Sequence, residues 1–389
     1  MAFPYGWKKR FTCTIDHTKV PENTPWVTVR LIASMIPASV FTNSKADGSD
    51  IRFSSDTAGA TPLACEITLF SKTPNIAEIW VLVPNVSHTI NTLFYLWTSN
   101  PLASAVSVTD TYGRNAVWTT ASYIHVHHFQ EASGTLINAT GDATYNGTGS
   151  NLTYREDAED GTYCIRFNSA SNSRVALGGN CLNSGTNRTI QGWIYLNSWG
   201  GGGTGGLGRI LSNESGGSGL FFKVVGNSSG HHETIAMDTV YGEEYGIALG
   251  AWYHVAVSRT LAAPGIFNFY VNGVLSGTAN QSQVTPAGGN ESYGCRGDGT
   301  NDRNFDGWMS EMRVSDAVQS ANALLLAYNS ESDPASFVSL GSETNFLGSL
   351  QIAVGGAWKE TIPVNIAVGG AWKNVTGIKV ASGGTWKDH

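Results

Sequence analysis

Short segments of alternating apolar and polar residues fill the first hundred positions of the chain. They read FTCTI, WVTVRLIAS, CEITLF, AEIWVLVP and INTLFYLWT, and turn clusters such as PENTP and SDTAGATP separate them. A period of two, with many β-branched and aromatic side chains, predicts strands. Because no helical pattern lies between these strands, we expect an antiparallel sheet folded as a β-sandwich.

The same strand signals resume after residue 160. They include TYCIRFN, RTIQGWIYLN, WYHVAVSRT, FNFYVNG and WMSEMRVS. The pair Asn272-Gly273 predicts a two-residue type I′ hairpin. One short helix is expected over ANALLLAYN, because Ser320 precedes it as a suitable N-cap and good helix formers follow.

The C-terminal end repeats one phrase three times. Each copy has an alternating apolar piece, a Gly-Gly pair and then a Trp-Lys pair, at a period of 14 residues. This pattern predicts strand, tight turn and strand. One such unit cannot bury its own tryptophan, so we expect an assembly interface made by stacked copies. A small β-meander packed on its own domain is the alternative. The interface candidates are Trp358, Trp372, Trp386, Lys359, Lys373 and Lys387.

Composition excludes several classes of protein. The 389 residues carry a net charge of −7 and only 14% charged residues, with no basic stripe, so nucleic acid is not an expected partner. No apolar run approaches 18 residues, so no membrane insertion is expected. The N-terminus shows no secretory signal. The chain has five cysteines, an odd number, and no CxxC motif. This predicts free thiols in a protein that folds in a reducing cytoplasm.

Ordered series of these segments resemble known families. Residues 6 to 118 resemble a family of uncharacterised β-rich domains that precede concanavalin A-like domains in prokaryotic surface and phage structural proteins, through GWKKRFTCTID, VTVRL and ADGSDIRFSSDTAGATPLACEITLF. The next part resembles a concanavalin A-like (laminin-G-type) jelly roll, through GTYCIRFNSASNSRVAL, WYHVAVSRT and FNFYVNGVLSGTA. The closing phrase resembles Gly-Gly-x-Trp-Lys repeats of phage tail and appendage proteins.

These resemblances imply an all-β chain in three parts. We expect an N-terminal β-sandwich over residues 1–118, a concanavalin A-like jelly roll over 119–341 and a small C-terminal β-repeat module over 342–389. A fold of this kind does not fix a reaction, so function has to be sought in particular residues.

The resemblance to a concanavalin A-like sandwich raises the possibility of a glycoside hydrolase, which needs two facing carboxylates. The acidic run REDAEDG at 155–161 lies in a loop-like stretch and is interpreted as a solvated turn. Glu311 lacks a second carboxylate in register on its strand. We therefore expect that the protein is not an enzyme. His125 and His127 share one strand face and His128 lies on the other, and we interpret them as half-buried strand residues rather than metal ligands.

The jelly-roll resemblance implies calcium as a possible cofactor, held by loop oxygens. The candidates are Asp298, Asn301 and Asp302 in one loop and Asp142 in another. The open alternative is that these residues only shape turns. The resemblance also implies glycan binding by loop aromatics and amides. The candidates are Trp199, Tyr241, Tyr245, Tyr293 and Asn301.

Together these features predict a virion structural and adhesion protein of a bacteriophage: a tail fibre, tail tip or capsid appendage. It is expected to be made in the host cytoplasm, to form a homo-oligomer, and to bind other virion proteins and host-surface polysaccharide. Two alternatives stay open. One is a polysaccharide-degrading enzyme, and the other is a purely structural decoration protein without a ligand.

Overall fold

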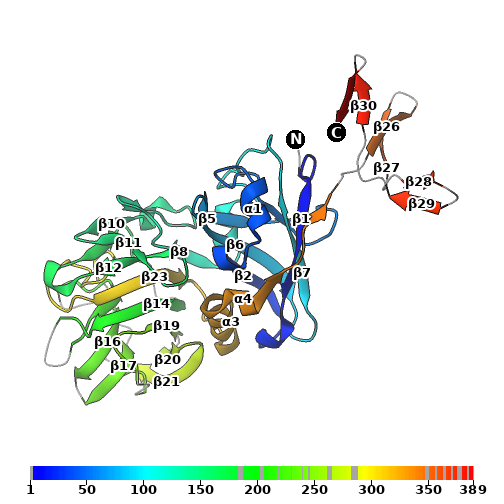
Figure 1. Ribbon diagram of the computed structural model, residues 1–389. Helices are drawn as coiled ribbons and strands as arrows, with labels where there is room; N and C mark the ends of the chain where they lie inside the picture. Colours follow the sequence, from blue (N-terminus) through cyan, green and yellow to red (C-terminus); the bar gives the residue numbers. More distant parts are fainter. Residues whose placement is uncertain are drawn as a thin grey trace.

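The computed structural model contains two β-sandwiches joined side by side and three short hairpins (Figure 1). The described residues are 3–182, 187–201, 206–216, 219–228, 230–238, 240–243, 246–260, 265–281, 288–346, 350–354, 357–361, 365–368, 371–374, 379–382 and 385–388. All strand pairs given below are antiparallel, as the sequence pattern predicts.

The first sandwich consists of a six-stranded and a three-stranded sheet. The strands of the larger sheet are β1 (Lys9–Ile15), β3 (Arg52–Ser54), β4 (Pro62–Leu63), β7 (Thr92–Thr98), β24 (Val338–Leu340) and β25 (Thr344–Asn345). Their order is β24-β1-β7-β3-β4, and β25 also pairs with β1. The smaller sheet has the order β2-β6-β5, with β2 (Thr24–Ile32), β5 (Cys65–Lys72) and β6 (Asn75–Val86).

Alternation along these strands produces the core of the first sandwich. On β1, Phe11, Cys13 and Ile15 are at most 1% exposed, and the residues between them are half-buried. Strand β6 is buried on both faces, which explains its continuous apolar run. Its residue Val81 faces the first core, whereas Trp80 faces the second sandwich.

In the part of the chain that the structure describes, helices are few and short. They are α1 (Ala38–Asn43), α2 (Arg114–Thr119), α3 (Ala321–Ser332) and α4 (Pro334–Phe337), with 3-10 turns at His17–Lys19, Ala33–Met35, Ala143–Tyr145 and Ser169–Ser171. The expected N-cap of α3 is confirmed, because the Ser320 hydroxyl accepts the backbone N–H of Ala323 at 3.1 Å. Among the described residues, no helix is long and apolar enough to cross a membrane.

The second sandwich consists of two eight-stranded sheets. One has the order β18-β17-β16-β15-β22-β13-β10-β9. Its strands are β9 (Thr135–Leu136), β10 (Gly147–Ser150), β13 (Arg174–Leu177), β15 (Arg209–Ser212), β16 (Phe221–Ser228), β17 (His231–Met237), β18 (Val240–Tyr241) and β22 (Ser292–Tyr293).

The facing sheet has the order β11-β12-β23-β14-β19-β20-β21, and β8 pairs with β23. Its strands are β8 (Tyr123–His127), β11 (Thr153–Asp157), β12 (Tyr163–Phe167), β14 (Arg188–Ser198), β19 (Trp252–Arg259), β20 (Gly265–Val271), β21 (Val274–Gln281) and β23 (Asp306–Ser315). The predicted hairpin joins β20 to β21, with φ of 51° at Asn272 and 75° at Gly273.

The chain returns to the first sandwich after β23. Phe337 and Val338 lie in the first core, and Leu340 pairs with Cys13 of β1. On α3, Leu326 packs into that core while Leu324 packs against the second sandwich. Residues 338–345 therefore complete the first sheet, whereas the sequence placed the jelly roll up to residue 341. The difference arises because β24 pairs with the otherwise free edge of β1. A local sequence pattern does not reveal pairing between strands so far apart in the chain.

The closing repeats form three hairpins, in agreement with the strand–turn–strand prediction. They are β26 (Leu350–Val354) with β27 (Ala357–Thr361), β28 (Asn365–Val368) with β29 (Ala371–Asn374), and β30 (Lys379–Ser382) with β31 (Thr385–Asp388). The registers are equivalent: Trp358, Trp372 and Trp386 each stand opposite an alanine. Within the strands that the structure describes, no pairing joins one hairpin to another.

Candidate functional site

A cleft of about 490 Å³ lies where the two sandwiches meet. Strands β3 and β5 and the segment before α2 line one side, and the segment after β8 together with β11 lines the other. Its lining is rich in charge of both signs, with Arg52, Glu66, Arg114, His128, Glu131 and Arg155. The cleft therefore combines carboxylates and cations from parts of the chain that are far apart in sequence.

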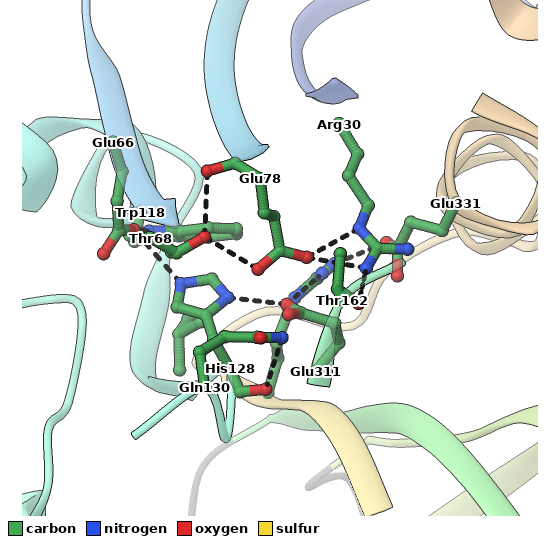
Figure 2. Close-up of polar contacts among 12 residues, drawn as sticks. Arg30, Glu66, Thr68, Glu78, Trp118, His128, Gln130, Thr162, Glu311 and Glu331 are labelled. Carbon is green, nitrogen blue, oxygen red and sulfur yellow. Dashed lines mark hydrogen bonds and ion pairs between the residues drawn. The ribbon is translucent and has the colours of Figure 1, made fainter. Parts of the chain in front are cut away.

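His128 lines this cleft and lies between two carboxylates (Figure 2). Its Nε2 is 3.1 Å from Glu66 Oε2, and its Nδ1 is 2.7 Å from Glu311 Oε2. Burial by itself disfavours the imidazolium, but the two carboxylates outweigh it and raise the pKa of His128 well above 6.5. Trp118 also donates its indole N–H to Glu66. The imidazolium thus joins a carboxylate of each sandwich.

A second cation, Arg30 of β2, extends the same network. One of its Nη atoms lies 2.6 Å from Glu78 Oε1, and the other lies 2.6 Å from Asp160 Oδ2. Burial raises the pKa of Glu78 to about 7, although Arg30 opposes this shift. The acidic run at 155–161 is therefore not only a solvated turn, because part of it is strand β11 and Asp160 pairs with a buried arginine.

Arg313 of β23 connects this network to α3. Its guanidinium lies 3.0 Å from Glu311 Oε2 and 2.6 Å from Glu331 Oε1. Burial raises the pKa of Glu311, but His128, Arg313 and Arg30 outweigh burial and hold it below its usual value. The sequence predicts that Glu311 lacks a second carboxylate in register on its own strand, but it does not reveal that Glu78 of the other sandwich lies beside it.

Two carboxylates of the cleft have different environments. Glu66 is held by Trp118 and His128. Glu131 accepts the backbone N–H of Ile137 with Oε1 at 2.8 Å, while its Oε2 is buried and has no partner among the described residues. Burial raises the pKa of Glu131. Neither residue stands out in the sequence, because 65 positions separate them and no strand pattern connects them.

A second hollow of about 370 Å³ lies at the edge of the jelly roll. It is lined by Trp199, which directly follows β14, by Asn227 of β16 and by His232 and Glu233 of β17. Trp199 is half-buried because it also packs against the jelly-roll core, whereas the other three residues are exposed. The hollow therefore offers an aromatic side chain together with amide, imidazole and carboxylate groups.

The other predicted glycan-binding residues are dispersed. Tyr293 was wrongly placed in a surface loop: it is 0% exposed and its hydroxyl contacts His125 and His127. It is buried because β22 lies between β13 and β15 inside the sheet. Tyr241 is half-buried and stacks on His231, with ring centroids 4.0 Å apart. Tyr245 lies outside the described residues.

The calcium candidates are not gathered into one site. Asp142 caps the 3-10 turn at 143–145, accepting the backbone N–H of Thr144 at 2.9 Å. Arg296 lies 3.1 Å from Asp298 and 3.6 Å from Asp302. A guanidinium therefore already neutralises these two carboxylates.

Asn301, which we predicted as both a calcium and a glycan ligand, accepts a hydrogen bond from the Asn304 side chain. The assembly candidates Trp358, Lys359, Trp372 and Lys373 lie on β27 and β29. Trp386 and Lys387 lie on β31, at equivalent backbone positions.

Solved structures that align with part of the chain include toxin and hydrolase domains. The botulinum neurotoxin serotype D binding domain aligns with a TM-score of 0.40 and 15% identity, over 54% of this chain and 52% of that chain. Domain 4 of AbnA, a GH43 extracellular arabinanase from Geobacillus stearothermophilus solved in complex with arabinotriose, aligns with a TM-score of 0.40 and 15% identity, over 53% and 98%. The chain thus spans about half the length of the neurotoxin domain that it matches.

These similarities are too weak to carry an argument about function. No curated protein matches the chain in sequence. A family model does match part of it: residues 168–324 match the concanavalin A-like lectin/glucanases superfamily, Laminin_G_3. The matched segment begins just after β12 and ends within α3. Over these residues the chain contains a domain of the concanavalin A-like lectin/glucanases superfamily.

Proposed function

We propose that the protein is a virion structural and adhesion protein of a bacteriophage, and that its jelly roll binds host-surface glycans without cleaving them. The observation that carries the binding role is the hollow beside Trp199. It lies within the segment that matches a lectin and glucanase superfamily. The virion role rests on the Gly-Gly-x-Trp-Lys repeats and on the resemblance of the N-terminal sandwich.

The chemistry of the hollow suits a sugar. Ligand sites combine apolar surface with a few well-placed polar groups that fix orientation. Here the Trp199 ring supplies the apolar surface, and Asn227, His232 and Glu233 supply donors and acceptors. Because the three polar residues are exposed, they are available to a saccharide chain without rearrangement of the core.

Binding to isolated envelope polysaccharide of candidate host bacteria tests this proposal. The full chain is compared with Trp199→Ala and Asn227→Ala, and with Trp26→Ala as a control on the first sandwich, where Trp26 is 45% exposed. We expect the first two variants to lose about tenfold or more in affinity, as for an anchor residue. The control keeps full affinity. Equal binding by all four proteins refutes the hollow as the site, and no binding by any of them favours a decoration protein.

A second candidate function, polysaccharide hydrolysis, is favoured by one observation in the cleft. Glu66 and Glu131 line the same cavity, and burial raises the pKa of Glu131. A hydrolase needs one carboxyl group that keeps its proton and another that is ionised. Release of reducing sugar by the full chain, abolished in Glu131→Gln, would establish this activity and overturn the proposal of binding without cleavage.

A further inference from the structure

Three buried side chains from separate segments meet inside the jelly roll. His125 belongs to β8, Cys181 follows β13 and Glu291 directly precedes β22. They are 0%, 3% and 0% exposed, respectively. One nitrogen, the sulfur and one carboxylate oxygen all lie within 4.8 Å of one another. This cluster is separate from the cleft and from the hollow beside Trp199.

A hydrogen-bond chain determines which atom of His125 faces the cluster. His127 Nε2 lies 2.9 Å from the backbone carbonyl of Tyr145, which only accepts, so this nitrogen carries a proton. The ring is fully buried, and its other hydrogen-bond contact in the described part of the chain is the neutral phenol of Tyr293, so the ring is expected to be neutral. His127 Nδ1 therefore accepts from the Tyr293 hydroxyl. The Tyr293 oxygen in turn accepts from His125 Nδ1 at 3.1 Å.

His125 thus carries a proton on Nδ1 and directs Nε2 at the cluster. That nitrogen lies 3.1 Å from Glu291 Oε2. A neutral imidazole would place its Nε2 lone pair against a carboxylate oxygen, and two acceptors at this distance repel each other. A proton or a metal ion must therefore lie between them. The proton would be carried by either His125 or Glu291, and a metal ion would take its place.

We propose that His125 Nε2, Cys181 Sγ and the Glu291 carboxylate bind a divalent transition metal, with zinc as the best match. Zinc takes nitrogen, sulfur and carboxylate ligands, and sites with three protein ligands complete their tetrahedron with a water molecule. Two ligands at the tetrahedral angle around zinc lie roughly 3.3–3.7 Å apart, given bond lengths of about 2.0–2.3 Å. The measured 3.1 Å between His125 and Glu291 is close to that spacing.

The surroundings suit a bound dication. Leu182 donates its backbone N–H to Glu291 Oε1 at 2.8 Å, which orients the carboxylate. Tyr293 fixes the ring of His125, as second-shell partners of metal-bound histidines do. On binding, the Cys181 thiol releases its proton, and the thiolate and carboxylate together balance the charge of the ion. Without a metal ion, burial and Glu291 raise the pKa of the Cys181 thiol well above its usual value and Arg188 only opposes this shift, so the ion itself has to displace the proton.

The other buried group of possible metal ligands is less suited to bind a metal ion. Glu78, His128 and Glu311 also lie close together, but Arg30 and Arg313 bind their carboxylates directly. Three cations therefore already occupy that network. The His125 cluster joins β8 to the segments beside β13 and β22, so a metal there ties together three parts of the jelly roll.

Metal analysis of the full chain, purified after growth with added zinc, tests the proposal. We expect one zinc per chain, and a lower melting temperature after removal by a chelator. Replacement by Co²⁺ is expected to give the near-ultraviolet charge-transfer band of a cobalt–thiolate bond. Two variants, Cys181→Ser and Glu291→Gln, are compared with the control Cys164→Ser, another buried thiol of the same sandwich.

The cobalt band should disappear in Cys181→Ser and persist in Cys164→Ser. His231→Ala/His232→Ala serves as the control for adventitious binding at the surface and should keep both the band and the zinc. If wild-type protein takes up neither zinc nor cobalt, the charge between His125 and Glu291 is a proton and the proposal is wrong. Bound metal without a thiolate band, or with a band that survives in Cys181→Ser, also overturns it. The wild-type spectrum decides the question even if a variant fails to fold.

Discussion

Arg30 of the first sandwich and Asp160 of the jelly roll form an ion pair, with Nη1 2.6 Å from Oδ2. The same guanidinium lies 2.6 Å from Glu78 on the neighbouring strand β6. One buried arginine therefore neutralises a carboxylate of each sandwich. Together with His128 and Arg313, it makes the contact between the sandwiches depend on exact matching of charges rather than on apolar area alone.

Replacing Arg30 by methionine tests this contact. The variant Arg30→Met keeps most of the volume but leaves Glu78 buried without its cation. We expect the free energy of unfolding at pH 7 to fall by about 3–5 kcal/mol. Urea denaturation measures the loss, and Lys19→Met, an exposed cation of the same sandwich, is the matched control. A loss equal to that of the control would show that the pair contributes nothing.

The His128 imidazolium gives the stability a defined pH dependence. Its pKa is raised in the folded state, so its contribution is complete below the unfolded pKa of about 6.5 and is lost as pH rises through the folded pKa. In His128→Gln the two carboxylates lose their cation, and we expect a loss of about 3–5 kcal/mol at pH 6. The difference from wild type should shrink towards alkaline pH. A difference that is constant from pH 6 to 10 would contradict the assignment.

Phe337 tests whether the C-terminal segment belongs to the first core. This residue of α4 is 1% exposed and packs within that core. Truncation in Phe337→Ala should lower the free energy of unfolding by about 3–5 kcal/mol, because it leaves a cavity. Leu102→Ala, at a position that is 74% exposed, is the control and should change it little. Proteolysis of the variant should then begin in the first sandwich. Cleavage confined to the jelly roll would count against this packing.

Deletion of residues 347–389 tests the assembly role of the repeats. The deletion retains Glu343, which pairs with Lys9, and Phe346, whose ring contacts Trp97 at 4.6 Å between centroids. The two sandwiches should therefore keep their melting temperature. If the repeats assemble chains, the mass measured by light scattering falls to that of a monomer. An unchanged oligomeric mass would rule out this role.

The sequence by itself determined the local elements of this protein. The period of two on β1 predicts which side chains face the core, Asn272-Gly273 predicts the hairpin turn, and Ser320 predicts the start of α3. Each of these features depends on residues only a few positions apart, through backbone preference and capping. The all-β class follows from the same local signals repeated along the chain, whereas the concanavalin A-like segment was identified through its resemblance to that family.

The tertiary structure alone decided which side chains meet. The sequence predicts that Tyr293 lies in a surface loop, but the order of strands in its sheet buries this residue. Glu66, His128 and Glu311 become neighbours only because β5 and β23 belong to sandwiches that pack together. Sheet order and the docking of the two sandwiches arise from the summed burial of whole faces, and no short stretch of sequence encodes that sum.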